Sequence, residues 1–389
     1  MAKLSDVFTL QMGKTPARAK DEYWNNGDNA WISISDLSAY NKYVGETKET
    51  ISNLAIIESG IKPVPADTVI MSFKLTIGKT AVTTKPTYTN EAIMAFIPNG
   101  NYAVYSGYFY HFFGGRDWSK GTNRAVMGTT LNKATLSEIE IDIPSLSEQI
   151  EIAEHLDKLD FLISQRQQQL EKLDELVKSR FIEMFGDSVT NSKGIPTKEM
   201  TAVCTIIDGD RGKNYPKQDE FADTGHCLFL NAKNVTATGF SFENCMYITK
   251  EKDNLLRNGK LERGDVVLTT RGTLGNLAFY DDSVPFDNVR INSGMVILRM
   301  KKSVVSEIFF IEQFKLQLQS IKEKIASGSA QPQLPISTMN KIRILIAPMA
   351  QQEQFAAFVE QTDKLKFEVK EALEKLKTLK KALMQKYFG

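Results

Sequence analysis

Two Gly-Lys-Thr tripeptides, at residues 13–15 and 78–80, are the first candidates for chemistry, because that tripeptide ends a phosphate-binding loop. A loop of this kind needs another glycine five residues earlier, so that successive backbone N–H groups can wrap the phosphates. Phe8 and Phe73 occupy those two places. The surroundings of the second tripeptide also recur as residues 266–279, without the Lys-Thr pair. The glycine therefore belongs to a repeated fold element, and the sequence argues against a nucleotide site.

Other patterns that could support catalysis are weak. A DNA amino-methyltransferase would need an Asn/Asp-Pro-Pro-aromatic loop, and the chain has no Pro-Pro dipeptide. The stretch 112–118, Phe-Phe-Gly-Gly-Arg-Asp-Trp, is not a glycine-rich turn of the kind that holds S-adenosylmethionine. Asp36 with Glu46-Thr47-Lys48 imitates the Asp…Glu-x-Lys pattern of nucleases, but such a tripeptide is common by chance. We therefore expect no catalytic residues in this chain.

The histidines and cysteines give no site either. Three histidines are present, none of them beside a Ser or Cys nucleophile with an orienting carboxylate. His226 and Cys227 are adjacent rather than at ligand spacing, so no metal site is expected. Cys204, Cys227 and Cys245 are irregularly spaced thiols, which suits a reducing cytoplasm. We expect a cytoplasmic, non-catalytic protein with no metal and no cofactor of its own.

The composition is that of an ordinary globular protein. The formal net charge is +1, which neither indicates nor excludes a nucleic-acid partner. The first residues lack the continuous apolar stretch of a signal peptide. No apolar run approaches the roughly 18 residues expected of a membrane span. The length of 389 residues allows two or three domains.

The chain contains an internal repeat. Residues 131–186 and 334–389 align without a gap, from Leu-x-x-x-Thr through an Ile-x-Ile-x-Ile strand to a Phe-Gly end. The same shift pairs Gln149 with Gln352 and the two Leu-Glu-Lys-Leu stretches. Upstream segments match more loosely, with β-rich runs, turn residues and isolated glycines. A period near 200 residues is too long for a solenoid, so the sequence predicts two copies of one α+β module, each followed by a long helix.

The two helices have an apolar stripe. After Pro144, Ser145 and Glu148 form a capping-box pattern, and apolar residues then recur every three or four positions, with interruptions at Arg166 and Arg180. A helix with one such stripe is not stable alone in water, so we expect the two helices to pair as a coiled coil. The predicted interface residues are Leu156, Leu159, Ile163, Leu170, Leu173, Val177, Phe358, Leu365, Val369, Leu373, Leu376 and Leu383.

Charge supports the pairing of the helices. Residues 141–186 contain 5 basic and 10 acidic side chains, whereas residues 346–389 contain 8 basic and 6 acidic ones. An acidic helix gains from pairing with a basic one and resists pairing with a copy of itself. Because the chain returns through a whole globular domain, an antiparallel arrangement is favoured. The alternative is that each helix packs on its own globular domain.

The sequence resembles a known family. The stretches Gly-Lys-Thr-Pro (13–16), Trp-Ile-Ser-Ile-Ser-Asp (31–36), residues 64–82 and residues 136–160 are similar to specificity subunits of type I restriction–modification enzymes. The Ile-Pro-x-Leu-x-x-Gln start of the first helix is the most telling piece. The resemblance covers essentially the whole chain in both halves. The second half departs at Ala347-Pro348-Met349 and at Asn276, and neither change touches the architecture.

The resemblance implies an α+β fold with two repeated target recognition domains, separated by two long helices that pair as an antiparallel coiled coil. The expected boundaries are 1–145 and 188–345 for the recognition domains, and 146–187 and 346–389 for the helices. Each domain would read one half of a bipartite double-stranded DNA target, and the helices would fix the unread spacer. Partner modification subunits, two of them expected, would bind S-adenosylmethionine and methylate adenine, and restriction subunits would translocate and cleave DNA in a bacterial or archaeal cytoplasm.

Candidate DNA contacts are polar and basic residues near turns, because Arg, Lys, Asn and Gln read base edges and phosphates. In the first domain they are Lys14, Lys74, Lys79, Arg116, Asn123 and Arg124. In the second they are Arg211, Lys213, Asn214, Arg271, Arg290 and Asn292. Lys74 and Arg271 occupy equivalent positions in the repeat. For each residue the alternative is a solvated surface side chain.

Two other functions fit parts of the pattern. The chain could be the specificity part of a type IIB-like system, which the sequence does not separate from a type I subunit. It could also be a coiled-coil scaffold that presents two protein- or glycan-binding domains. The repeat disfavours the scaffold, because two matched domains at a fixed separation suit a repeating polymer such as DNA.

Overall fold

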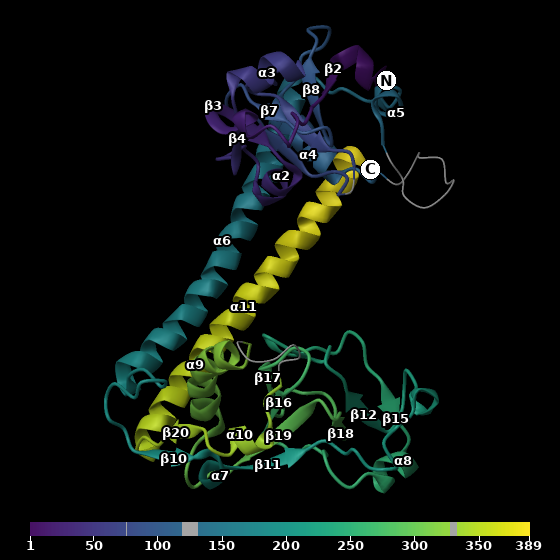
Figure 1. Cartoon of the computed structure of the whole chain (residues 1–389). Coiled ribbons are helices and arrows are strands. Elements are labelled where there is room, and N and C mark those ends of the chain that lie inside the picture. Colours follow the sequence, from purple (N-terminus) through teal and green to yellow (C-terminus); the bar gives the residue numbers. More distant parts are fainter. Residues whose placement is uncertain (75, 119–130, 327–332) are drawn as a thin grey trace. The chain divides into compact units, whose positions relative to one another are not determined.

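The chain forms two compact units in the computed structural model, which describes residues 1–74, 76–118, 131–326 and 333–389 (Figure 1). Unit 1 comprises Met1–Gln167 and Glu371–Gly389, and unit 2 comprises Gln168–Lys370. Two helices of 40 residues each, α6 (Leu146–Phe185) and α11 (Met349–Phe388), belong partly to one unit and partly to the other. None of the helices in the described ranges combines the length and apolar character that a membrane span requires.

Both units contain a four-stranded antiparallel sheet with the same strand order. The order is β2-β8-β5-β6 in unit 1 and β11-β19-β16-β17 in unit 2. The strands are β2 (Phe8–Met12), β5 (Val69–Ser72), β6 (Thr80–Val82), β8 (Ile93–Pro98), β11 (Cys204–Asp208), β16 (Asp265–Thr269), β17 (Leu277–Tyr280) and β19 (Met295–Met300). The predicted repeat of sequence is therefore a repeat of fold.

A three-stranded mixed sheet also recurs, with order β4-β3-β7 in unit 1 and β15-β12-β18 in unit 2. Its central strand has one antiparallel and one parallel neighbour in each unit. A two-stranded ribbon, β1-β9 or β10-β20, completes the set, and β13 pairs with β14 in unit 2 only. These strands are β1 (Ala2–Lys3), β3 (Trp24–Ile32), β4 (Glu49–Ile51), β7 (Tyr88–Thr89), β9 (Glu140–Ile141), β10 (Thr197–Glu199), β12 (Cys227–Leu230), β13 (Val235–Thr236), β14 (Gly239–Phe240), β15 (Tyr247–Ile248), β18 (Val289–Ile291) and β20 (Arg343–Leu345).

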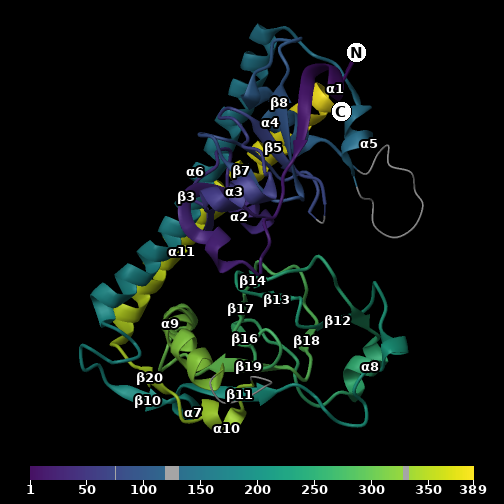
Figure 2. The same cartoon turned by 45° about the horizontal axis from the view of Figure 1, so that its top comes forward.

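Short helices surround these sheets. They are α1 (Leu4–Val7), α2 (Ile34–Ala39), α3 (Asn53–Ser59), α4 (Ser106–Gly115), α5 (Lys133–Ser137), α7 (Met200–Val203), α8 (Lys250–Leu255), α9 (Glu307–Ala326) and α10 (Ile336–Met339), with 3-10 turns at Asp21–Tyr23 and Gln218–Glu220. In unit 2, α9 lies against the sheet and beside the first turns of α11 (Figures 1 and 2).

The four-stranded sheet of unit 1 is buried on both faces. Met94 and Phe96 of β8 pack into the cluster that contains the aromatic face of α4, whereas Ile93 and Ala95 pack into a cluster with Ile32 and Leu37. Because successive side chains of a strand point to opposite faces, β5, β6 and β8 each contribute residues to both clusters, whereas β2 contributes to the first cluster alone. This explains why the strand reads as a continuous apolar run rather than an alternating one.

The long helices pair antiparallel, as predicted. In unit 1 the Asp160 carboxylate of α6 pairs with the Lys380 ammonium of α11. In unit 2 Asp174 pairs with Lys366 at 2.7 Å. The later residue of α6 pairs with the earlier residue of α11, which shows that the two helices run antiparallel. Burial opposes the charge of Lys366, but Asp174 and Asp363 raise its pKa above the ordinary value. These ion pairs join the acidic helix to the basic one.

The seam between the helices differs from the prediction at Leu365. This side chain is 47% exposed, while Thr362 is buried and Lys366 is half-buried. The heptad spacing of α11 runs from Val359 through those two polar residues to Val369. Apolar residues alone therefore gave the wrong register at this point. The other predicted positions are buried or half-buried: Leu156, Leu159, Ile163, Leu170, Leu173, Val177, Phe358, Val369, Leu373, Leu376 and Leu383.

The Phe-Gly end found in both repeats has a structural role. At the end of α6, the ring of Phe185 lies 4.8 Å from that of Phe309 in α9. At the end of α11, the ring of Phe388 lies 5.4 Å from that of Tyr108 in α4. Gly186 then stops α6 with a φ of 77°, a conformation that side chains disfavour. Each globular part thus holds the beginning of one helix and the end of the other.

We predict that Phe185→Ala destabilises unit 2 by about 3–5 kcal/mol, because it empties a fully buried site between aromatic rings. Phe161→Ala on the same helix is the control, since Phe161 is 62% exposed. Urea denaturation followed by circular dichroism measures the free energy of unfolding of both variants. An equal loss of stability in the two variants would contradict this packing.

Candidate nucleic-acid interface

Three loops of unit 1 are joined by backbone hydrogen bonds at one end of the four-stranded sheet. The loop after β2 is bound to the segment around β7 and β8, because the Lys14 N–H donates to the Thr89 carbonyl (2.8 Å) and the Gly13 N–H donates to Ile93 (3.1 Å). The Phe73 N–H of the β5–β6 loop donates to the Ala92 carbonyl (3.0 Å). Gly13 lies so close to the carbonyls of residues 89 and 90 that no other residue type fits.

The equivalent three loops of unit 2 are joined by one backbone and one side-chain hydrogen bond. The Thr270 N–H of the β16–β17 loop donates to the Gly294 carbonyl (2.9 Å). The Arg211 guanidinium, from the loop after β11, donates to the Ser293 carbonyl (3.1 Å). Gly209 approaches the Asn292 carbonyl as closely as Gly13 approaches its neighbours. We call these two groups of loops loop set 1 (residues 13–20, 73–74, 76–79 and 90–92) and loop set 2 (residues 209–216, 270–276 and 292–294).

The hairpin loop in each set has the same internal hydrogen bonds. The hydroxyl of Ser72 accepts from the Lys79 N–H (3.1 Å), and that of Thr269 accepts from the Asn276 N–H (2.9 Å). Gly78 and Gly275 directly precede these two N–H donors, and their φ angles of 88° and 81° are ones that glycine adopts at no steric cost. This confirms that the glycine belongs to a repeated turn.

Lys74 and Arg271 stand at the same place in the two hairpin loops, two residues after Ser72 and Thr269. The Arg271 side chain is exposed, and Lys74 is half-exposed with its ammonium 5.3 Å from the centre of the Phe73 ring. Each sits on a loop that its internal hydrogen bonds hold in shape. A cation on such a loop can donate to a base edge or a phosphate without ordering a flexible segment first.

The other basic residues predicted for the first domain lie in different surroundings. Lys14 is exposed, and its ammonium donates to the Ser59 carbonyl. Lys79 is exposed at the end of the hairpin loop. Arg116 follows α4 and lies half-buried, 5.5 Å from the ring of Phe112. Asn123 and Arg124 lie outside the described residues.

In the second domain Arg211, Lys213, Asn214 and Asn292 lie in loop set 2. Arg211 and Lys213 are exposed, and Arg211 also pairs with Asp208 at 3.1 Å. The Asn214 amide donates to the Leu255 carbonyl (3.1 Å). The Asn292 side chain accepts from the Gly294 N–H (2.9 Å), which shapes the turn beside Arg271. The structure thus brings four of the predicted polar residues together with Arg271.

Arg290 differs from the others, because its side chain is only 5% exposed. Its guanidinium pairs with the buried carboxylate of Asp253 and donates to the Asn258 carbonyl (2.8 Å). A buried charge of this kind needs its partner, and here the pair ties α8 to the three-stranded sheet. The sequence placed Arg290 among the DNA contacts, but in this structure it supports the domain from inside.

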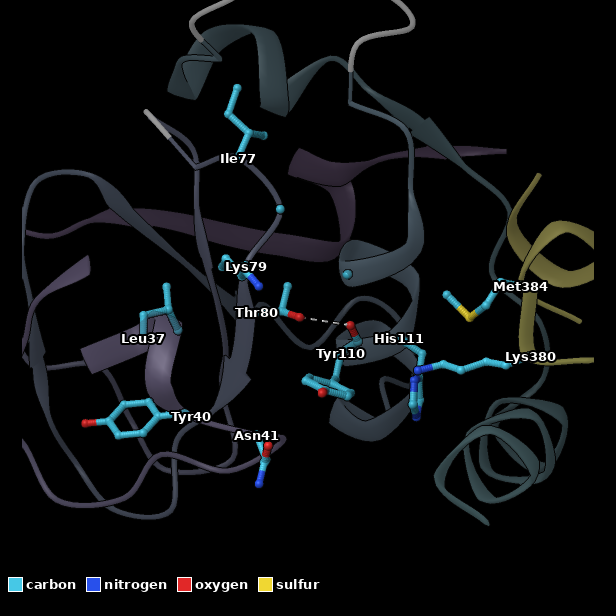
Figure 3. A pocket seen from close by; sticks show the side chains of 12 residues that line it. Leu37, Tyr40, Asn41, Ile77, Lys79, Thr80, Tyr110, His111, Lys380 and Met384 are labelled. Atoms are coloured by element: carbon cyan, nitrogen blue, oxygen red, sulfur yellow. Dashed lines mark hydrogen bonds between the residues drawn. The ribbon is translucent and has the colours of Figure 1, made fainter. Parts of the chain in front are cut away.

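A hollow of about 380 Å³ opens beside loop set 1 (Figure 3). Lys79 and Thr80 come from the hairpin side, and Lys380 and Met384 come from α11. His111, also in the wall, bonds the Asp157 carboxylate through Nε2 (2.9 Å). Burial lowers the pKa of His111, although Asp157 opposes that shift. The other lining residues are Leu37, Tyr40, Asn41, Ile77, Gly78, Tyr110 and Gly114.

Asp36, which was considered for catalysis, has a structural role. Asp36 is buried and caps α2, where its carboxylate accepts from the Ser33 N–H (3.0 Å) and hydroxyl (2.7 Å). Within the described residues, no group of three or more His, Cys, Asp and Glu side chains could hold a metal ion. The loop sets can therefore offer hydrogen bonds and positive charge, which is binding chemistry.

Two residues were aligned by the repeat without being assigned a role. Gln149 and Gln352 are identical at the shift of the two helices, and both side chains are 0% exposed. A buried glutamine retained at the same place in two copies was the signal that could have marked them.

Comparison with known proteins agrees with the fold. Residues 1–173 and 193–380 match the family described as the type I restriction modification DNA specificity domain. The chain belongs to this family. It is 27% identical over 386 residues to the specificity subunit of the type I restriction enzyme MjaIX of Methanocaldococcus jannaschii, covering 92% of this chain and 85% of that protein. It is 29% identical over 168 residues to the EcoR124I/EcoR124II specificity subunit of Escherichia coli, covering 41% of this chain and 40% of that protein.

Solved structures show the same fold. The S subunit of the type I restriction–modification system of M. genitalium aligns with a TM-score of 0.57 and 15% identity, over 100% of this chain and 95% of that one. A chain from a structural study of type I restriction–modification complex assembly aligns with a TM-score of 0.57 and 14% identity, over 100% and 96% of the two chains.

Proposed function

We propose that this chain is the specificity subunit of a type I restriction–modification enzyme and reads a DNA target in two halves. Loop set 1 reads one half-site and loop set 2 reads the other. The observation that carries this proposal is the occurrence of one hairpin loop in both units, with a basic residue at the same position, Lys74 or Arg271. A scaffold for unrelated ligands would have no reason to keep this position basic twice.

The chemistry of the loop sets suits DNA. An arginine such as Arg271 can donate two hydrogen bonds to a guanine, and a lysine such as Lys74 or Lys79 can bind guanine or a phosphate. An amide such as that of Asn214 or Asn292 can pair with an adenine when its present bonds are exchanged. The formal charge of +1 is low for a DNA-binding protein, so partner subunits supply part of the phosphate neutralisation.

The long helices set the distance between the half-sites. A helix of 40 residues is about 60 Å long at 1.5 Å per residue. Two such helices, joined by the Asp160–Lys380 and Asp174–Lys366 pairs, make a stiffer spacer than a flexible linker. The length of the unread DNA between the half-sites follows from this spacer.

The enzymatic steps belong to partner subunits in a bacterial or archaeal cytoplasm. A modification subunit binds S-adenosylmethionine and methylates adenine, and a restriction subunit translocates and cleaves DNA. This chain contributes no catalytic residue and no cofactor. A type IIB-like complex would use the same loop sets with a different set of partners.

The helix pair offers two equivalent docking places for the modification subunits. Two leucines of each helix, Leu162 and Leu176 on α6 and Leu365 and Leu379 on α11, fall at the heptad position just before the seam, and antiparallel pairing puts these positions on the same side. The register set by the two ion pairs brings Leu162 to the level of Leu379 in unit 1 and Leu176 to the level of Leu365 in unit 2. Leu176 and Leu379 are each 48% exposed. We call these pairs leucine patch 1 and leucine patch 2, and each suits an apolar face of a partner helix.

We predict that Leu379→Glu removes one modification subunit from the complex, that Leu176→Glu removes the other, and that the double variant binds none. A charge in an apolar contact is costly when no partner compensates it. Gln168→Glu, at an exposed position on the outer face of α6, is the control. The masses of co-purified complexes measured by mass photometry decide the matter. Full assembly by the double variant would contradict docking at the leucine patches.

Selection from a library of random duplexes, using this chain together with its modification subunit, tests the proposed function. The expected result is enrichment of two short sequence elements at a fixed separation. Enrichment of a single contiguous element, or no sequence enrichment at all, would contradict a two-part reader.

A further inference from the structure

The Gln149 side chain joins α6 to the globular part of unit 1 through three hydrogen bonds. Its Nε2 donates to the carbonyls of Ala103 (3.0 Å) and Pro144 (3.0 Å). Its Oε1 accepts from the Tyr105 N–H (2.9 Å). Pro144 precedes α6, whereas Ala103 and Tyr105 belong to the link between β8 and α4.

The Gln352 side chain does the same in unit 2. Its Nε2 donates to the carbonyls of Val304 (3.2 Å) and Ala347 (2.8 Å), and its Oε1 accepts from the Ser306 N–H (2.9 Å). Ala347 precedes α11, and the other two residues link β19 to α9. The residues bonded to the two glutamines differ in type, yet the three bonds have the same pattern. We call each arrangement a glutamine clamp.

Only a side-chain amide can make all three bonds, because it offers two donors and an acceptor within one planar group. Both glutamines are fully buried, so water does not replace a lost partner. A glutamate of the same shape would place a carboxylate against two carbonyl oxygens. A methionine of similar size would leave the two carbonyls and the N–H unpaired.

Each clamped link continues directly from a central strand of the four-stranded sheet. Strand β8 begins just after residues 90–92 of loop set 1 and ends at Pro98, close to the link. Strand β19 begins just after residues 292–294 of loop set 2 and ends at Met300. Because β8 and β19 each pair with two neighbours, their sheets move with them. The glutamine therefore fixes the direction of a loop set relative to the long helix that starts beside it.

We propose that Gln149 and Gln352 are positioning residues, each of which aligns one loop set with its own half-site. This inference rests on the proposed function and adds to it the residues that couple each loop set to the long helix beside it. Loss of one clamp lets one sheet tilt on its helix. Contacts to one half-site then weaken, while the other loop set still reads its half-site.

The experiment compares full-length Gln149→Glu and Gln352→Glu chains in complex with the modification subunits. Methylation rates are measured on duplexes that carry the intact target, a change in the first half-site or a change in the second. Discrimination is the ratio of the rate on the intact target to that on a changed one. Each variant is expected to lose about tenfold in discrimination at one half-site and less than about twofold at the other, because one buried group loses its partners. The two variants must affect opposite half-sites.

Equal losses at both half-sites, losses at the same half-site, or no loss would overturn the proposal. Gln149→Met and Gln352→Met repeat the test without a new charge, in case a glutamate prevents folding. Gln168→Glu and Gln351→Glu are the matched controls, because both side chains are exposed on the same helices. If the unaltered chain shows no division into half-sites, the proposed function itself fails, which is a distinct outcome.

Discussion

Removal of one heptad from each long helix is expected to shorten the preferred spacer by about three base pairs, because seven residues span about 10.5 Å and one base pair about 3.4 Å. The deletions must lie opposite each other, at residues 165–171 of α6 and 369–375 of α11. The Asp160–Lys380 and Asp174–Lys366 pairs then remain in register. Methylation of the original target should fall at least about 100-fold, because three base pairs also rotate a half-site by roughly 100° around the duplex.

A library of duplexes with graded spacers measures this effect on the purified complex. The control deletes the heptad from α6 alone, which shifts one helix against the other and should abolish folding of the pair. The doubly shortened chain should prefer a shorter spacer. Its methylation rate on that spacer should be below the rate of the unaltered chain on the original target. An unchanged preferred spacer in the doubly shortened chain would contradict the role of the helices.

Replacement of the basic residue in either hairpin loop is expected to damage one half-site only. Arg271→Ala should reduce discrimination at one base pair by about 5- to 150-fold, which corresponds to about 1–3 kcal/mol for a lost bidentate contact. Lys74→Ala should act on the other half-site. Methylation rates on targets with single base-pair changes measure both. Each loop is held by its own hydrogen bonds, so the fold should survive.

Lys341→Ala and Lys62→Ala are controls for this pair, because both lysines are exposed outside the loop sets. A fall in affinity that is uniform over all sequences would assign Arg271 or Lys74 to the phosphates instead. An effect of both variants on the same half-site would contradict the assignment of one loop set to each half.

Much of the architecture could be predicted from the sequence, because each pattern that occurs in both repeats is less easily explained by chance than a pattern that occurs once. The Ile-x-Ile-x-Ile stretch, the helix start with Gln149 and the Phe-Gly end occur twice, and each has the same structural role in both units. The topology of the sheets did not follow, since β3 pairs with β7 more than 50 residues further along the chain, and local pattern says nothing about such a partner.

The site was predictable only where geometry is local. Lys74 and Arg271 lie on turns that the sequence marks with glycine, and their contact with DNA stays a prediction. Arg290 is buried instead, because its partner Asp253 is 37 residues away in the sequence and only the folded domain brings the two together. Leu365 was wrongly predicted to lie in the interface between the long helices for a related reason. The register of the two helices decides which residues face the partner helix, and in this register Thr362 and Lys366 face it instead of Leu365.

A genome-wide map of N6-methyladenine tests whether this chain reads one DNA target in two halves. Host cells with and without the gene are compared, with the modification subunit present in both. Methylation is expected to disappear at a single split motif, two short elements around a fixed gap, when the gene is absent. Methylation that stays the same at every motif would contradict recognition of a two-part target by this chain.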